Sequence, residues 1–216
     1  MKMDETPAMT EEEEEETIHY WMEAKNQLER LLFREWNVMM LIHNSVEFQE
    51  IIEFINKMPY ANRMAYITLN KTCNSVKPYF QEPYFRLMTK VSIVDCISKR
   101  IIKKEKIKGC YAENPPSNLK EMAVLIDRYL ATINPDLVVL DSLSKFIDFN
   151  TENDNQWLFK FLNYLKSRSS ETDRKFILLY DDTTSNDIIG SLPRYNIDLI
   201  FKLEEKKMKK KIAWRG

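Results

Sequence analysis

Glycine is almost missing from this sequence of 216 residues. It occurs three times, at positions 109, 190 and 216, so the first half of the chain contains none. A phosphate-binding loop of the P-loop type needs several glycines within a few residues, because its backbone wraps closely around the phosphate oxygens. The scarcity and isolation of the glycines therefore exclude a conventional P-loop anywhere in the chain.

Cysteine and histidine are also scarce. The three cysteines, Cys73, Cys96 and Cys110, are an odd number without a CxxC pair. This pattern argues against a disulfide framework and a zinc site, and it predicts core thiols in the reducing cytoplasm. His19 and His43 are the only histidines, which limits metal-binding and acid–base chemistry built on imidazole.

Long apolar runs are absent as well. None approaches the roughly 18 residues that span a bilayer. The N-terminus begins with acidic residues instead of the basic stretch and apolar run of a secretory signal. With 44% hydrophobic residues, the composition predicts one soluble cytoplasmic α/β domain with a full core, over residues 17–216.

Charge is unevenly placed, although the net charge is only −1. Six consecutive glutamates at 11–16 predict a disordered acidic tail over residues 1–16. Basic residues are concentrated at 98–109 and 202–216. The favoured interpretation is a set of solvated faces, but a contact between the acidic tail and a basic region of another copy, or binding to a phosphate backbone, stays open. The candidate contact residues of the first basic stretch are Lys99, Arg100, Lys103, Lys104, Lys106 and Lys108.

Amphipathic stretches alternate with short apolar runs. Helical spacing predicts helices at 17–36, 46–58, 117–133 and 155–168, whereas continuous apolar runs predict buried strands at 38–42, 65–69, 91–97, 136–141 and 175–182. Such alternation is typical of βαβ units. The sequence therefore predicts a three-layer α/β domain with a mainly parallel central sheet.

Several elements carry finer expectations. Pro78 and Pro83 should break helical structure at 73–88, and Ser117 or Asn118 should cap the helix at 117–133. At the C-terminus, 197–204 and 209–215 are predicted to pair as a β-hairpin. In the helix at 155–168, the residues expected to face inward are Trp157, Phe161, Leu162 and Leu165.

Ligands of open α/β sheets bind at the carboxyl ends of the strands, so the residues after each apolar run are candidates for a site. The first run leads into "HNSVEF" (43–48) and the second into "NKT" (70–72). The later runs end at Asp95, Asp141, Asp181 and Asp182. These carboxylates could share a Mg²⁺ ion, but strand-end aspartates are more often helix caps. Ser142 and Ser144 lack the flanking glycines of a nucleophile elbow.

The order of segments over residues 36–216 resembles the RecA-like ATPases, in particular their KaiC/RadA-like branch. "PDLVVLDSLSKF" (135–146) resembles the Walker B strand of that family, and "AYITLNKT" (65–72) resembles its second strand. "VSIVDC" (91–96) and the closing "KKKIAWRG" (209–216) are similar to later strands. The resemblance implies a RecA-like fold with a C-terminal hairpin and the position of an ATP–Mg²⁺ site. That site would fall on His43, Asn44, Ser45, Asn70, Lys71, Asp141 and Ser142.

The chain differs from the resembled family at the positions that catalysis requires. In place of the glycine-rich loop ending in Gly-Lys-Ser/Thr it has "HNSVEF", with no lysine and with Glu47 where phosphate charge would lie. The family's acidic pair on the second strand, which activates water, is replaced by Asn70 and Lys71. The resemblance thus implies a pseudo-ATPase with no catalytic residues, metal or cofactor.

We therefore expect a protein-interaction or regulatory module. Its partner would be a second copy or an active RecA-like relative, because RecA-like domains commonly assemble side by side. The alternative is a nucleotide- or nucleic-acid-binding protein that uses a non-standard site.

Overall fold

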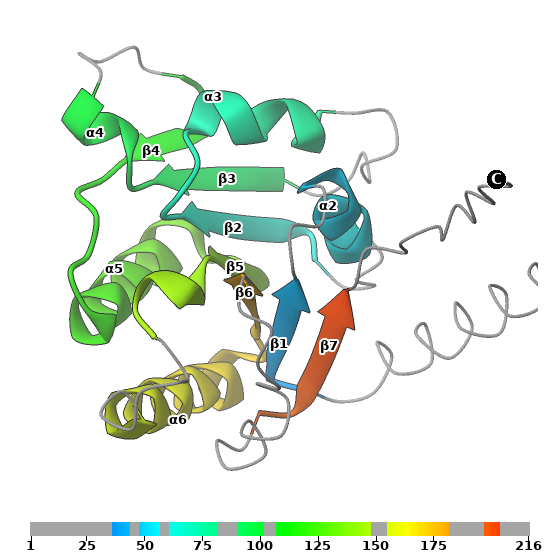
Figure 1. Ribbon diagram of the computed structural model, residues 1–216, viewed down its shortest axis with the longest axis vertical. Coiled ribbons are helices and arrows are strands. Elements are labelled where there is room, and N and C mark those ends of the chain that lie inside the picture. The colour runs from blue at the N-terminus through cyan, green and yellow to red at the C-terminus, as the bar shows by residue number, and fades with distance from the viewer. Residues whose placement is uncertain are drawn as a thin grey trace, which may run out of the picture.

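The computed structural model describes residues 36–43, 48–56, 61–81, 90–101, 107–147, 155–181 and 197–203. They form one seven-stranded sheet in the order β4-β3-β2-β5-β6-β1-β7 (Figure 1). Every described pairing is parallel. The strands are β1 (Val38–His43), β2 (Arg63–Thr68), β3 (Lys90–Asp95), β4 (Cys110–Ala112), β5 (Leu137–Asp141), β6 (Lys175–Asp181) and β7 (Leu199–Leu203).

Helices cover both faces of the sheet (Figure 1). One face carries α2 (Phe48–Asn56), α3 (Cys73–Val76) and the 3₁₀ turn η1 (Lys77–Phe80). The other carries α5 (Leu119–Ile133), α6 (Asn155–Thr172) and the 3₁₀ turn η2 (Leu143–Lys145). The short helix α4 (Ser98–Ile101) follows β3. All residues of β1 and β5 are buried, which explains their continuous apolar runs.

The predicted fold class is confirmed: the protein is a three-layer α/β domain with the parallel sheet expected of a RecA-like fold. The five predicted strands and three of the predicted helices are present, and Asn118 caps α5. The short β4 and α4 were not predicted. The helix expected at 17–36 and the second hairpin strand at 209–215 lie outside the described residues. None of the described helices is long and apolar enough to cross a membrane.

The cysteine prediction is wrong. Cys73, at the start of α3, forms a disulfide with Cys110, the first residue of β4, and their Cα atoms are 6.2 Å apart. Cys96 is buried and unpaired. The odd cysteine count therefore reflects one bridge and one core thiol, and it no longer supports placement in a reducing compartment.

The prediction that Trp157 faces inward is also wrong, because 54% of its surface is exposed. Leu158 is fully buried in its place and begins the stripe that packs on the sheet. The stripe repeats at intervals of three and four residues, as on any helix with one buried face. Its members are Leu158, Phe161, Leu162 and Leu165.

Two aspartates fix where neighbouring strands begin. Asp198, directly before β7, accepts hydrogen bonds from the backbone N–H groups of Asn37 and Val38 at 2.8 and 2.9 Å. Asp136, directly before β5, accepts from Asn62 and Arg63 in the same way at 3.1 and 2.9 Å. In each case the carboxylate satisfies donors at the start of the adjacent parallel strand, which sets the register of the pair.

Asp198 also accepts from the Lys166 ammonium of α6 at 2.8 Å, so it ties the edge strand to a helix. Partial burial alone would raise the pKa of this carboxyl, but the hydrogen bonds from Lys166, Val38 and Asn37 outweigh it and lower the pKa. The stability that these bonds contribute is present above the ordinary carboxyl pKa, and it is lost as pH falls through the lowered value.

Replacing Asp198 with alanine should lower the free energy of unfolding by about 1–3 kcal/mol, because two backbone donors and one ammonium lose their acceptor. Asp198→Asn keeps an acceptor oxygen without the charge and should cost clearly less. Urea denaturation at pH 7 measures both variants. Equal losses for the two would contradict the hydrogen-bonding role.

Candidate functional site

A row of polar side chains lies at the carboxyl edge of the sheet. On β1 and β6, His43 pairs in register with Asp181. On the neighbouring strands, Thr68 of β2 pairs with both Asp141 of β5 and Asp95 of β3. Each residue lies two positions beyond a core residue on the face of the sheet that carries α2, α3 and η1, so all five side chains lie on that face. We call His43, Asp181, Asp141, Thr68 and Asp95 the polar row.

Asp141 lies in the middle of this row and is fully buried. Its Oδ2 atom accepts a hydrogen bond from the Lys71 ammonium at 2.9 Å and one from the Tyr66 hydroxyl at 2.6 Å. The Lys71 side chain is 29% exposed, whereas that of Asp141 has no exposed surface. The buried end of the aspartate is therefore paired with a cation that the protein itself supplies.

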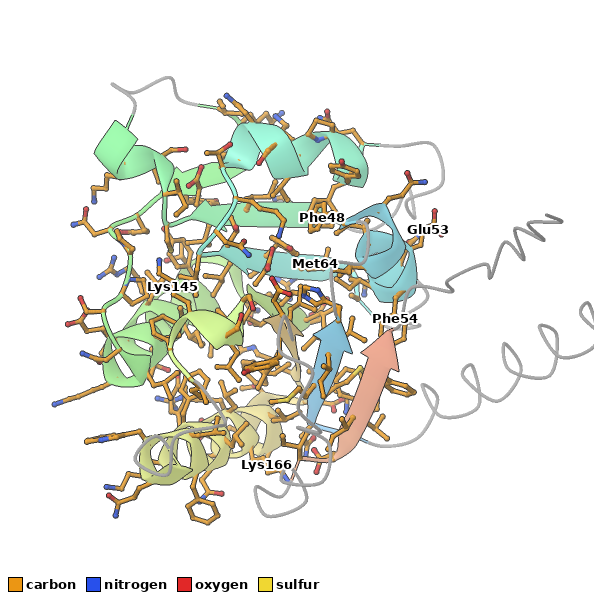
Figure 2. The ribbon with its side chains drawn as sticks, in the orientation of Figure 1. Phe48, Glu53, Phe54, Met64, Lys145 and Lys166 are labelled. Carbon is orange, nitrogen blue, oxygen red and sulfur yellow. A yellow bond between two sulfur atoms is a disulfide. The ribbon has the colours of Figure 1, made fainter. Side chains whose placement is uncertain are left out.

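The loop after β2 places Lys71. The Thr68 hydroxyl accepts from the Lys71 backbone N–H and donates to the Lys71 carbonyl, both at 3.0 Å, which closes a tight turn. The ammonium lies 4.8 Å from the centre of the Phe48 ring. Phe48 lies at the start of α2 (Figure 2). Asn70 adds a side-chain acceptor at 3.3 Å. Carboxylate, aromatic ring and amide together hold the lysine over the strand end.

The protonation of Tyr66 is also fixed by this arrangement. Burial raises the pKa of its hydroxyl well above 10, and the negative charge of Asp141 and the hydrogen bond to it raise the pKa further. Tyr66 therefore stays protonated and continues to donate to Asp141 throughout the ordinary pH range.

Asp95 has a complete set of partners. Its two oxygens accept from the backbone N–H groups of Cys73, Ile97 and Ser98 and from the Ser98 hydroxyl. Burial would raise the pKa of this carboxyl, but these hydrogen bonds outweigh it and lower the pKa. Asp95 joins the starts of α3 and α4 to β3, which leaves it no role as a metal ligand.

Ser142 serves the connection between strands. Its hydroxyl donates to the carbonyl of Leu179 on β6 at 3.1 Å, and it shares a hydrogen bond of 2.5 Å with the Ser144 hydroxyl. Ser142 also caps η2. The peptide bond between Asp141 and Ser142 is cis. These contacts hold the end of β5 against β6 instead of presenting a nucleophile.

Three members of the polar row keep buried atoms without a hydrogen-bond partner among the described residues. They are both ring nitrogens of His43 and one oxygen each of Asp141 and Asp181. Burial lowers the pKa of His43, although the charges of Asp181 and Asp141 partly offset it. The imidazole is thus neutral at pH 7. Among the described residues, no three histidine, cysteine or carboxylate side chains are placed to hold a metal ion.

The structure brings together some of the predicted site residues. Asn70, Lys71, Asp141 and Ser142 lie around the end of β5, with His43 two strands away. Asn44, Ser45 and Asp182 lie outside the described residues. Tyr66 and Phe48 were not singled out: Tyr66 was read as part of the apolar run at 65–69, and Phe48 only as the last residue of "HNSVEF" (43–48) and part of the helix at 46–58. The sequence did contain a signal for Tyr66. It lies two residues before Thr68, the last residue of its strand, so its side chain is on the same face of the sheet as those of Thr68 and Asp141.

The basic stretch is only partly described. Lys99 lies 3.8 Å from Glu113, which also binds Arg128 at 2.9 Å. Lys108 is exposed, and its carbonyl accepts from Lys77 at 3.2 Å. Lys103, Lys104, Lys106 and the side chain of Arg100 lie outside the described part.

The lone histidine of the polar row yields a pH prediction. Because the pKa of His43 is lowered in the folded state, its neutral form contributes stability above the unfolded pKa of about 6.5, and this stability is lost as pH falls below that value. His43→Leu should flatten the fall in unfolding free energy between about pH 7.5 and 5.5. It should not destabilise the protein at pH 7, because neither ring nitrogen has a hydrogen-bond partner in the described part of the chain. Urea denaturation across this range tests it, with His19→Gln as the control; an unchanged slope would contradict the assignment.

A double-mutant cycle tests the buried ion pair. Lys71→Met alone should cost about 3 kcal/mol, because it leaves the buried Asp141 carboxylate without its cation. Combined with Asp141→Asn, the coupling energy should be about 2 kcal/mol. The more exposed pair Lys99 and Glu113 provides a matched cycle, for which we expect less than about 1 kcal/mol. Similar coupling for both pairs would show that burial adds nothing to the Asp141 contact.

Comparisons with known proteins give structural likenesses but no match in sequence. No family model matches the sequence, and no curated protein matches it. Among solved structures, a KaiC-like protein from the hyperthermophilic archaeon Pyrococcus horikoshii is similar, with 17% identity, a TM-score of 0.45, and coverage of 82% of this chain and 76% of that one.

Proposed function

We propose that this protein is a catalytically inactive RecA/KaiC-like domain that acts as a protein-interaction or regulatory module. The observation that carries the proposal is the state of Asp141, the residue that matches the family's Walker B aspartate. It is fully buried and bound by the Lys71 ammonium and the Tyr66 hydroxyl.

An ammonium in this position opposes metal binding. Mg²⁺ requires oxygen ligands in near-octahedral geometry and usually keeps several waters, which need an open side of the site. A Mg²⁺ ion about 4 Å from the ammonium would be repelled by roughly 8 kcal/mol at an effective dielectric constant near ~20. Lys71 thus neutralises the carboxylate that would otherwise attract the metal.

The sequence supports the same conclusion independently. "HNSVEF" offers no glycine and no lysine to a triphosphate, and position 70–71 carries Asn-Lys where the resembled family has an acidic pair. The chain thus lacks the glycine-rich phosphate-binding loop, the lysine of that loop and the carboxylate that activates water. Phosphoryl transfer depends on all three. The property of the resembled family that does not need these parts is the side-by-side assembly of its domains. We infer that the partner is a second copy or an active relative.

Isothermal titration with ATP and Mg²⁺ should give no binding heat, and no inorganic phosphate should be released over hours. Mg²⁺ or Mn²⁺ should leave the melting temperature unchanged, since a bound ion would raise it. Sustained phosphate release that is lost in Asp141→Asn would overturn the proposal.

The interaction half of the proposal needs its own measurement. Light scattering after size-exclusion chromatography, together with affinity purification at low salt, should reveal a self-association or a copurifying RecA-like protein. A strict monomer that copurifies with nothing would contradict this half, whatever the result with ATP.

A further inference from the structure

A pocket of about 380 Å³ lies away from the polar row, between the starts of α5 and α6 and the turn η2. Its apolar lining is formed by Leu119, Phe146, Ile147 and Trp157, and Lys120 and Lys145 also line it. Trp157 remains 54% exposed at its edge. Figure 2 shows Lys145 between α5 and the end of the sheet.

The charged side chains among the described lining residues of this pocket are both lysines, although Glu121 lies beside it and accepts a hydrogen bond from the backbone N–H of Ser117 at 2.8 Å. No carboxylate is among its described lining residues. Lys120 has no carboxylate partner within the described chain, and Lys145 donates only to the carbonyl of Leu69 at 3.2 Å. The ammonium of Lys160 lies 4.7 Å from the centre of the Trp157 ring. By contrast, Lys71, Lys99 and Lys166 are each matched by an acidic side chain.

Lys120, Lys145 and Lys160, none of which forms an ion pair among the described residues, lie beside an apolar hollow and favour a particular kind of ligand. The lysines create a local positive potential that attracts a run of negative charge. The hollow and the exposed indole accept an apolar side chain next to that run, as expected where an aromatic residue stays at the surface. The ligand should therefore be a peptide in which several carboxylates adjoin an apolar or aromatic residue.

We propose that this pocket binds the acidic segment of the same chain, residues 11–16, together with the apolar residues that follow it. The sequence "EEEEEETIHYW" (11–21) has the required order, with six glutamates followed by Ile18, Tyr20 and Trp21. The glutamates would lie along Lys120, Lys145 and Lys160, and an apolar residue would occupy the hollow. This inference goes beyond the proposed function and does not depend on the state of Asp141.

The chain is long enough for this contact. Nineteen residues lie between Glu16 and Trp36, the first described residue; their twenty Cα–Cα steps span up to about 70 Å when extended and about 30 Å as the helix predicted at 17–36. A folded chain of this size has a radius of gyration of only about 17 Å, so the extended segment can reach any part of the surface and the helical one can reach a large part of it. Tethering also gives the segment an effective concentration on the order of millimolar, which favours binding within one molecule.

Nucleic acid fits these observations less well. A single-strand site combines stacking aromatic rings with a charged groove that follows the backbone over several nucleotides. Here a single indole, two lining lysines and the nearby Lys160 border a compact pocket of about 380 Å³ and not an extended groove. The basic stretch at 98–109 does not extend the charge in its described part, because Lys99 is paired with Glu113.

The test uses a fluorescein-labelled peptide of residues 9–21 and fluorescence anisotropy. The receptor is the full chain with the six glutamates at 11–16 changed to glutamine, so that its own segment does not compete. This receptor should bind the peptide, and binding should weaken about tenfold when Lys120, Lys145 and Lys160 are changed to alanine, and also at high salt. The native chain should bind the peptide about tenfold more weakly than the glutamine variant, because its own segment occupies the pocket.

The controls separate the remaining outcomes. Changing Lys77, Lys90 and Lys108 to alanine removes the same charge elsewhere and should leave binding unchanged. Trp157→Ala removes an exposed side chain without a role in the core, and it should weaken binding. Equal binding by native and glutamine variants, or no effect of the pocket lysines, would overturn the proposal. So would a dimer of the native chain that the glutamine changes dissociate, which would assign the contact to a second copy, or a single-stranded oligonucleotide that binds these lysines while the peptide does not.

Discussion

The contact between the Lys71 ammonium and the buried Asp141 carboxylate determines how the carboxyl edge of this sheet can be used. A buried carboxylate is tolerated only with a partner, and here the partner comes from the loop after the adjacent strand. Tyr66 adds a hydroxyl that stays protonated, since burial beside Asp141 raises its pKa. In the function that we propose, Lys71 supplies the positive charge at the place where a metal ion would otherwise be attracted.

This contact depends on the parallel sheet. Because β2 and β5 are neighbours in register, Asp141 lies beside Thr68, whose turn returns Lys71 to the strand end. The register in turn depends on the strand starts, where Asp136 and Asp198 bind backbone donors of adjacent strands. In a parallel sheet, the register that is fixed where the strands begin also determines which residues lie side by side where the strands end. The aspartates at the strand starts therefore help to place Asp141 beside Thr68.

The sequence predicted the architecture well and the site only in part. Helical periodicity located the longer helices, and continuous apolar runs located most strands, because strands buried on both faces are apolar throughout. The short β4, the disulfide of Cys73 with Cys110 and the exposure of Trp157 were not predicted. The first two depend on which segments of the chain meet in the fold, and the third depends on the rotation of a helix by one residue. A local sequence pattern determines neither of these. The pairing of Lys71 with Asp141 is a tertiary contact of the same kind, although both residues had been singled out separately.

A crystal structure determined at high concentrations of ATP and Mg²⁺ tests the central claim most directly. Our account predicts that the Lys71 ammonium stays within hydrogen-bonding distance of Asp141 and that no triphosphate lies against residues 43–48. A bound triphosphate at that position, with Lys71 moved away and a metal ion beside Asp141, would contradict it.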